Sequence, residues 1–238
     1  MRIKIITLFP KMFEGFVGES IIKRAIEKNV CEIEIIDMRD YSLSKHRHVD
    51  DTPYGGGAGM VLACDVVDRA IKANSGEGSY KIMMTPQGNK YNQQKALELA
   101  KKEEIVLICG HYEGFDERIR TFVDEEISVG DYVLTGGEIP SMIVADSVIR
   151  LLGEAIKQES HEDDSFSNGL LEYPQYTRPA VWNGLEVPEV LLKGNHKLIC
   201  EWKRMMSLKT TYEKRKGMLK KAKLTSKEEN YIKSLDLM

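Results

Sequence analysis

The sequence predicts an α/β fold, in which a mostly parallel sheet is flanked by helices, followed by a small all-helical C-terminal domain. Three observations predict it. Strand-like and helix-like segments alternate along the first two thirds of the chain, a polar and acidic stretch interrupts the alternation, and the remainder has mainly helical periodicity. We therefore expect an α/β domain at 1–152, a linker at 153–167 and a helical domain at 168–238.

Periodicity places each element of the α/β domain. Two-residue alternation or a short apolar run predicts strands at Arg2–Leu8, Glu32–Asp37, Tyr80–Thr85, Ile105–Cys109, Glu126–Val129 and Tyr132–Leu134. Helical spacing of apolar residues predicts helices at Phe13–Lys28, Asp65–Ala73, Asn92–Lys102, Asp116–Phe122 and Ile139–Leu152. The apolar side chains of the last helix suit either the core or a subunit interface, and the periodicity does not choose between them.

The pattern changes after Leu152. The segment Gly153–Phe166 is polar and acidic with little periodicity, which is typical of a linker or mobile loop. A stretch rich in proline and aromatic residues follows, and then helical spacing returns at Asn195–Leu208 and Ser226–Leu237.

Composition excludes several classes of protein. Hydrophobic residues make up 42% of the chain and charged residues 30%, as in an ordinary globular protein. No apolar run reaches membrane-spanning length, and the first ten residues alternate like a strand and lack a cleavage site. We expect a cytoplasmic protein with no membrane partner. The four cysteines lie far apart and form no C-x-x-C pair, so we expect them to be reduced packing residues.

The net charge of −3 conceals a segregation of charge. Between Lys193 and Lys223 there are eleven Lys or Arg and two acidic residues, a local balance of +9, whereas the rest of the chain carries 23 basic and 35 acidic residues. Such a stretch is typical either of a solvated helix face or of a surface that binds an anion such as a nucleic acid.

Glycine-bearing segments follow several of the predicted strands. They are Pro86–Gly88, Gly110–Gly114 and Gly136–Gly137, and a further glycine run occupies Gly55–Gly59. Any one of them could be an ordinary turn. Because ligands of open α/β sheets bind beyond the carboxyl ends of the strands, and glycine lets the main chain approach closely, their recurrence predicts a ligand site.

The motifs restrict the class of ligand. The chain has no G-x-x-x-x-G-K-[ST] and no G-x-G-x-x-G after its first strand, which disfavours a nucleoside triphosphate or dinucleotide. The segment at 110–114 instead carries His111, Tyr112 and Glu113, so we expect a neutral or cationic ligand with an aromatic ring. The pair His46 and His48 suggests a metal, but no third ligand is suitably spaced, and we predict no metal site.

Longer motifs connect the chain to a known family. They are DDTPYGGGAGM at 50–60, TPQG at 85–88, GHYEGFDER at 110–118, SVGDYVLTGGEIP at 128–140, DSF at 164–166, GLLEYPQYTRP at 169–179 and VPEVLLKGNH at 187–196. In these motifs, in order along nearly its whole length, the chain resembles the bacterial tRNA (guanine-N1)-methyltransferases of the SPOUT class. The resemblance implies a deep trefoil knot at the end of the sheet, a feature otherwise almost absent from proteins, and S-adenosylmethionine as cofactor.

The resemblance also assigns cofactor contacts. Matched motif by motif, they are Pro86, Gln87, Gly110, Tyr112, Glu113, Gly114, Ser128, Val129, Gly130, Tyr132, Leu134, Gly136 and Gly137. It implies that a side chain at Gly136 or Gly137 would intrude on the cofactor, so that Gly136→Val would abolish binding in a protein that stays folded.

The catalytic roles rest on the same resemblance. Guanine N1 must lose its proton as the methyl group arrives, and negative charge gathers on O6. The resemblance implies Asp164 as the base and Arg150 near O6, in an active site completed by a second copy of the chain. By residue type alone, an acidic loop is more often solvated, and a helix-terminal arginine often complements the helix dipole.

On the RNA side, the implied acceptor is the guanosine immediately 3′ of the anticodon. The implied tRNA contacts are His46, Arg47, His48, Asp50, Lys203, Arg204, Lys214 and Arg215. The resemblance further implies a need for Mg²⁺, for which the sequence offers no dedicated ligand set.

The chain departs from the family pattern in three places. Leu151–Ala155 replaces a Pro-Gly-Val-Leu-Gly segment and is one residue shorter, Lys214–Lys216 replaces Arg-Arg-Pro, and His111 stands where many relatives have arginine.

Two alternatives remain open: a SPOUT-class enzyme acting on another atom, such as a ribose 2′-oxygen, and a non-catalytic RNA-binding relative. A hydrolase built on Asp163 and Asp164 is excluded, because adjacent carboxylates cannot flank one scissile bond.

Overall fold

The computed structural model describes residues 1–153, 155 and 164–235. The chain folds as two compact units, Met1–Lys157 and Gln158–Met238. The predicted α/β domain lies within the first unit and the predicted helical domain within the second.

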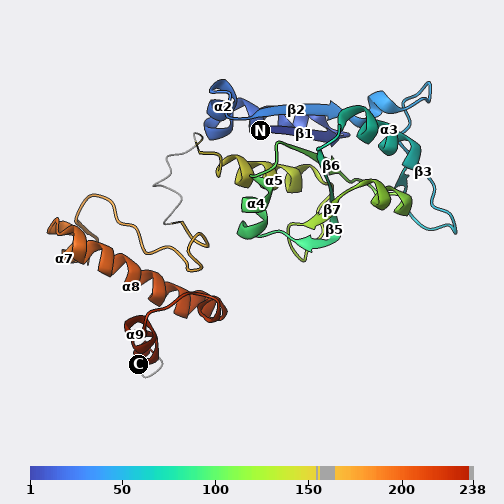
Figure 1. Cartoon of the computed structure of the whole chain (residues 1–238). Helices are drawn as coiled ribbons and strands as arrows, with labels where there is room; N and C mark the ends of the chain where they lie inside the picture. Colours follow the sequence, from blue (N-terminus) through green and yellow to red (C-terminus); the bar gives the residue numbers. More distant parts are fainter. Residues whose placement is uncertain (154, 156–163, 236–238) are drawn as a thin grey trace. The chain divides into compact units, whose positions relative to one another are not determined.

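A five-stranded, all-parallel sheet forms the centre of the first unit, with strand order β2-β1-β6-β5-β7 (Figure 1). In chain order the unit contains β1 (Arg2–Thr7), η1 (Pro10–Phe13), α1 (Glu14–Gly18), α2 (Ser20–Glu27), β2 (Glu32–Asp37), η2 (Met38–Tyr41), β3 (Asp50–Asp51), β4 (Val61–Leu62), α3 (Cys64–Asn74), β5 (Tyr80–Lys90), α4 (Gln93–Leu99), β6 (Glu104–Cys109), η3 (Glu117–Phe122), β7 (Glu125–Ser128) and α5 (Glu138–Ile149). The predicted central parallel sheet flanked by helices is therefore confirmed.

Helices cover both faces of this sheet, and each face has its own hydrophobic core. Ile105 and Leu107 of β6 pack with α2, α4 and α5, whereas Val106 and Ile108 pack with α3 and the short helices η2 and η3. All six residues of β6 are buried, which explains why its sequence is a continuous apolar run rather than an alternating one. Burying a side chain of this size contributes roughly 1.5–3 kcal/mol.

The prediction of a strand at Tyr132–Leu134 was wrong. The chain leaves the edge strand β7 and crosses back to β6, where the Gly137 amide donates to the Gly110 carbonyl at 2.8 Å. Val133 is 84% exposed and belongs to no strand. A short apolar run is ambiguous by periodicity, and here the chain is crossing between strands rather than pairing with one.

Three other predicted elements differ in detail. The helix expected at Phe13–Lys28 is broken at Ser20, whose φ of 56° lies in the left-handed region. The expected helix at Asp116–Phe122 is a 3₁₀ helix, η3. Strand β5 continues to Lys90, but its pairing with β7 shifts register between Met84 and Asn89, which bulges the intervening residues out of the ladder.

The second unit is not all-helical. It contains a hairpin of β8 (Val181–Trp182) and β9 (Leu185–Glu186), followed by α7 (Glu189–Leu192), α8 (His196–Arg215), η4 (Lys216–Lys220) and α9 (Ser226–Leu235). Its core gathers around Leu170, Leu208 and Leu219. Among the helices that the structure describes, none has the length and apolar character needed to cross a membrane.

Candidate functional site

The segments that follow β6 and β7 and the bulge in β5 line one cavity of about 370 Å³ at the carboxyl edge of the sheet. This volume lies within the range of about 300–1,000 Å³ that small-molecule sites occupy. The structure brings all thirteen sequence-predicted cofactor residues to the wall of this cavity: Pro86, Gln87, Gly110, Tyr112, Glu113, Gly114, Ser128, Val129, Gly130, Tyr132, Leu134, Gly136 and Gly137. His111, which the sequence placed in the predicted ligand segment, also lines the cavity. Sequence reasoning missed other residues of the wall, among them Thr85, Phe115, Glu117 and Arg120.

The first wall is the bulge in β5. It presents Pro86 and Gln87 to the cavity, and Gly88 anchors it. A Cβ on Gly88 would lie 2.5 Å from the main chain of Glu126 and Ile127. Only a residue without a side chain lets the bulge approach β7 so closely, so the packing of Gly88 against β7 fixes the position of the bulge.

The second wall is the tight turn after β6. The Gly114 amide donates to the His111 carbonyl at 3.0 Å, and Tyr112 adopts a φ of 58° that non-glycine residues rarely take. The Glu113 amide donates to the Met60 carbonyl at 2.9 Å, and its carboxylate lies where a Cβ on Gly59 would be. The turn therefore leaves Tyr112 and Glu113 exposed. Glu113 connects the turn to Gly59 and Met60, at the end of the glycine run at 55–59.

The third wall is the crossing segment 128–137. The Ser128 hydroxyl donates to the Gly130 carbonyl at 3.0 Å, and the Tyr132 ring lies against Gly130. Bare main chain from Gly130 and Gly136 therefore faces the cavity beside the Tyr132 ring.

The two glycines at the end of this segment face protein atoms. A Cβ on Gly137 would lie 2.7 Å from Cys109 Cα and 2.7 Å from Gly110 N, which belong to the main chain of β6 and its turn. A Cβ on Gly136 would lie 2.3 Å from Glu138 Oε2 and 2.6 Å from the His111 ring. An added side chain would therefore clash with main chain at Gly137 and with the side chains of Glu138 and His111 at Gly136. That it would also intrude on a cofactor stays a prediction.

Buried polar side chains lie next to Gly136 and Gly137. The Thr7 hydroxyl donates to Glu138 Oε1 at 2.8 Å, and Glu138 is 2% exposed. Glu138 Oε2 lies 3.7 Å from His111 Nε2, and the Ser141 hydroxyl lies 3.1 Å from Cys109 Sγ. Burial raises the pKa of the Cys109 thiol, so this cysteine stays protonated and does not act as a nucleophile.

The charged side chains of the wall favour a cationic ligand. Glu113 and Glu117 contribute carboxylates, whereas the positive charge of Arg120 is offset by Glu117 at 2.7 Å and by Glu126. Within residues 1–153, 155 and 164–235, no three His, Cys, Asp or Glu side chains come together as a metal site.

The predicted RNA-contacting residues of the first unit lie on a loop and on the strand β3 that follows it. Through β4, this strand is connected to the turn after β6 that lines the cavity. His46, Arg47 and His48 are exposed, and Arg47 pairs with Asp37 at 3.4 Å and with Asp40. Asp50 belongs to β3, which pairs with β4, and the Leu62 amide of β4 donates to the Gly114 carbonyl at 2.9 Å.

The two predicted catalytic residues belong to different units. Arg150 caps the C-terminal end of α5, where its amide donates to the Asp146 carbonyl at 2.9 Å. Asp164 is in the second unit, and its carbonyl accepts from the Ser167 amide at 3.2 Å. The three residues before Asp164, His161–Asp163, lie outside the described residues.

The predicted basic residues of α8 have different surroundings. The Arg204 guanidinium donates to Glu228 at 2.6 Å, so this side chain joins α8 to α9. The Lys203 ammonium lies 4.5 Å from the centre of the Tyr173 ring. Lys214 and Arg215 are exposed in the last turn of the helix.

The fold and the cavity define an α/β protein with a small-molecule site built on bare main chain at the carboxyl ends of parallel strands. Comparison with known proteins gives a more specific result. The family model described as tRNA (Guanine-1)-methyltransferase TrmD matches residues 1–221. The chain therefore belongs to the tRNA (guanine-N1)-methyltransferase family.

Individual relatives agree with this assignment. The chain is 52% identical to the tRNA (guanine-N(1)-)-methyltransferase of Geobacillus kaustophilus, covering 98% of this chain and 97% of the relative. It is 52% identical to the protein of the same name from Mycoplasmopsis synoviae, covering 94% and 99% of the two chains. The protein of that name from Fusobacterium nucleatum is also 52% identical, over 98% and 97%.

Proposed function

We propose that this protein transfers a methyl group from S-adenosylmethionine to N1 of the guanosine immediately 3′ of the anticodon in tRNA. The observation that carries the proposal is the convergence of all thirteen residues matched to the family's cofactor motifs on one cavity wall. The relatives' names supply the substrate class.

The cavity suits this cofactor on chemical grounds. Main-chain groups beside Gly110, Gly130 and Gly136 offer donors and acceptors to an adenine edge, and the Tyr132 ring offers an apolar surface. The carboxylates of Glu113 and Glu117 match a positive charge. When bound, S-adenosylmethionine supplies an electrophilic methyl group on a cationic sulfur.

Two residues carry the proton and charge transfer in this proposal. The Asp164 carboxylate accepts the N1 proton, which frees the nitrogen lone pair for the methyl group. The Arg150 guanidinium donates hydrogen bonds to O6, where negative charge develops as the proton leaves. Each role requires its side chain to lie beside the guanine base.

A homodimer would bring these groups together. In the proposed assembly, the cavity and Arg150 of one subunit meet Asp164 and the basic α8 of the other. The crossing of residues 129–137 from β7 back to β6 is the segment that would complete the trefoil knot. The linker at 153–167 would order when tRNA binds. We place the enzyme in the cytoplasm, with its substrate.

Binding of the anticodon arm is assigned to two surfaces. One is the exposed loop with His46, Arg47 and His48 beside Asp50, and the other is the C-terminal end of α8 with Lys214 and Arg215. Lys203 and Arg204 lie along the same helix, where Arg204 also holds Glu228. No step is assigned to Mg²⁺, because the described residues offer no cluster that fits it.

One experiment tests the proposal. The protein is incubated with labelled S-adenosylmethionine and tRNA variants of the anticodon loop, and the methylated nucleoside is identified by nuclease digestion and mass spectrometry. We expect 1-methylguanosine only where guanosine follows the anticodon. A methyl group on a ribose 2′-oxygen would favour the alternative enzyme, and no methyl transfer would favour an RNA-binding protein.

The catalytic roles are tested separately by Asp164→Asn and Arg150→Ala. Each variant is expected to lose at least about 100-fold in turnover, the usual contribution of a general base or charge-stabilising group. Each should still bind S-adenosylmethionine in a calorimeter. Asp146→Asn, an exposed change on α5, is the control. Undiminished turnover in Asp164→Asn would remove this residue from the mechanism.

A further inference from the structure

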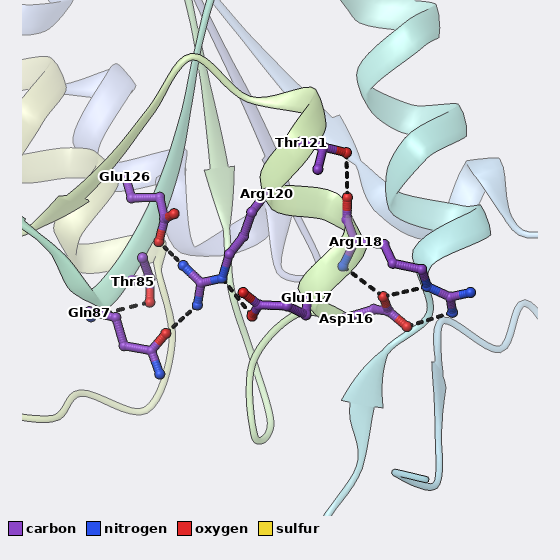
Figure 2. Close-up of polar contacts among 8 residues, drawn as sticks. All are labelled: Thr85, Gln87, Asp116, Glu117, Arg118, Arg120, Thr121 and Glu126. Atoms are coloured by element: carbon purple, nitrogen blue, oxygen red, sulfur yellow. Dashed lines mark hydrogen bonds and ion pairs between the residues drawn. The ribbon is translucent and has the colours of Figure 1, made fainter.

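Arg120 connects three elements at the rim of the cavity (Figure 2). From η3 its guanidinium donates to Glu117 at 2.7 Å, to Glu126 of β7 and to the side-chain oxygen of Gln87 in the β5 bulge. Arg120, Glu117 and Gln87 all line the cavity. The Arg120 side chain is 23% exposed, so it lies mostly among its partners rather than in solvent.

This arrangement fixes the orientation of the Gln87 amide. A guanidinium can only donate hydrogen bonds, so Gln87 must turn its oxygen toward Arg120. The amide nitrogen then points away from Arg120, as Figure 2 shows. Gln87 is otherwise exposed, and its main-chain amide donates to the Thr85 hydroxyl at 3.4 Å. Without Arg120, the amide could rotate and present either group to the cavity.

Arg120 itself contributes little net charge to a ligand. Two carboxylates accept from it, one of them Glu117, whose side chain is 82% exposed and faces the same cavity. A bound cation is therefore not repelled, and the effect of Arg120 reaches the cavity through the groups that it orients.

We infer that Arg120 is a positioning residue for the methyl donor: it holds Gln87 so that the amide NH₂ is offered to hydrogen-bond acceptors of the bound molecule. This inference rests on the proposed function, since it takes S-adenosylmethionine as the occupant of the cavity. The donor carries suitable acceptors in its ring nitrogens, its ribose oxygens and its carboxylate.

Lys95 provides a matched control for the removal of Arg120. Its ammonium also bridges two carboxylates, Glu98 at 2.8 Å and Glu125 of β7 at 3.0 Å, and its side chain is 22% exposed. Lys95 is not part of the cavity wall. Arg120→Met and Lys95→Met therefore each remove a cation that bridges two carboxylates, one of which lies on β7, at Glu126 and Glu125 respectively. Only the first variant releases Gln87.

A second variant, Gln87→Glu, separates orientation from stability. A carboxylate at this position still accepts from Arg120 but has no NH₂ to donate. A loss of affinity for S-adenosylmethionine in Gln87→Glu therefore cannot be attributed to a lost contact with Arg120. It also tests the inference independently should Arg120→Met fail to fold.

The measurement is calorimetric titration of each purified variant with S-adenosylmethionine, with the melting temperature as a check on folding. We expect Arg120→Met and Gln87→Glu to raise the Kd about fivefold or more, the contribution of one hydrogen bond. Lys95→Met should stay within about twofold of the wild type, well below that contribution.

The outcomes distinguish the inference from the proposed function. Absence of binding by the wild type would refute the proposed cofactor itself. Wild-type binding with equal Kd values for Arg120→Met and Lys95→Met would overturn the positioning role alone. Wild-type affinity in Gln87→Glu would overturn the orientation of the amide. A defect in Arg120→Met and Gln87→Glu, but not in Lys95→Met, would support the inference.

Discussion

Gly137 shows at the scale of one residue why the crossing segment has a fixed path. Its amide donates to the Gly110 carbonyl, and the main chain of β6 lies within 2.7 Å of the point where a Cβ would stand. The atoms in the way are main chain in the centre of the sheet, so they have no free rotation by which to yield.

We predict that Gly137→Ala destabilises the first unit by roughly 1–3 kcal/mol or more, the range for overpacking a rigid site. Thermal unfolding followed by circular dichroism measures it. Gly15→Ala is the control, because an added Cβ there meets nothing within 4 Å and alanine favours its helix. A melting temperature for Gly137→Ala equal to that of Gly15→Ala would refute the close packing.

Individual site residues could be predicted from the sequence only where they stood in motifs. Tyr112 and Gly136 lay in glycine-bearing stretches beside predicted strands, and the cavity contains both. Arg120 gave no such signal, because its partners Gln87 and Glu126 come from other elements and only the folded chain brings them together. Arg204 was predicted to contact RNA, but its contact with Glu228 joins two helices and required the packing of α8 against α9.

At the scale of elements, strands with a clear pattern were predicted closely, whereas turns and crossings were not. The alternation at Arg2–Thr7 and the apolar run of β6 follow directly from burial on one or both faces. The hairpin at Val181–Glu186 was missed although Asn183–Gly184 between its strands is a strong hairpin signal, with both residues left-handed at φ 51° and 80°.

Helix α9 begins with a capping box that contains a titratable carboxyl group, that of Glu228. The Thr225 amide donates to Glu228 Oε2 at 2.7 Å, and the Glu228 amide donates back to the Thr225 hydroxyl at 3.4 Å. Arg204 completes the cluster, and its hydrogen bond is the largest cause of the lowered pKa of the Glu228 carboxyl. The folded pKa thus lies below the unfolded value of about 4.3.

This shift predicts the pH dependence of the second unit. The stabilisation is fully present above the unfolded pKa of about 4.3 and is lost as the pH falls through the lower folded pKa. Glu228→Gln should cost about 1–2 kcal/mol at pH 7 and should flatten the loss of stability in acid.

Urea unfolding read by tryptophan fluorescence measures this, because both tryptophans, Trp182 and Trp202, belong to the second unit. Glu229→Gln, an exposed change one residue on, is the control. Identical acid profiles for Glu228→Gln and the wild type would contradict the assignment.

At the scale of the whole molecule, the two units carry opposite charge tendencies, and this separates the two proposed binding events. The +9 stretch between Lys193 and Lys223 belongs to the second unit, whereas the cavity of the first is lined by carboxylates and one compensated arginine. Each phosphate contact adds a slope of roughly −0.7 to −0.9 to the logarithmic salt dependence of binding.

We therefore predict that tRNA binding weakens steeply with added salt, whereas S-adenosylmethionine binding changes little. Filter binding of tRNA and calorimetry of the cofactor, each from 50 to about 300 mM salt, measure the two slopes. Lys214→Gln and Arg215→Gln together should reduce the first slope by roughly 1.4–1.8 and leave the second unchanged. Equal slopes for both ligands would contradict the separation.

The division into units also predicts which part of the activity each can retain. Every residue of the cavity wall lies between Met84 and Pro140, and both hydrophobic cores of the sheet are drawn from residues no later than Ala155. The fragment 1–157 should therefore fold, because it keeps every described residue of both cores, and should bind S-adenosylmethionine with the Kd of the whole chain. It should transfer no methyl group, because it lacks Asp164.

Calorimetry, circular dichroism and the methylation assay measure the three properties. A folded fragment that binds no cofactor would mean that the second unit supplies part of the site, and a fragment that methylates tRNA would remove Asp164 from the reaction.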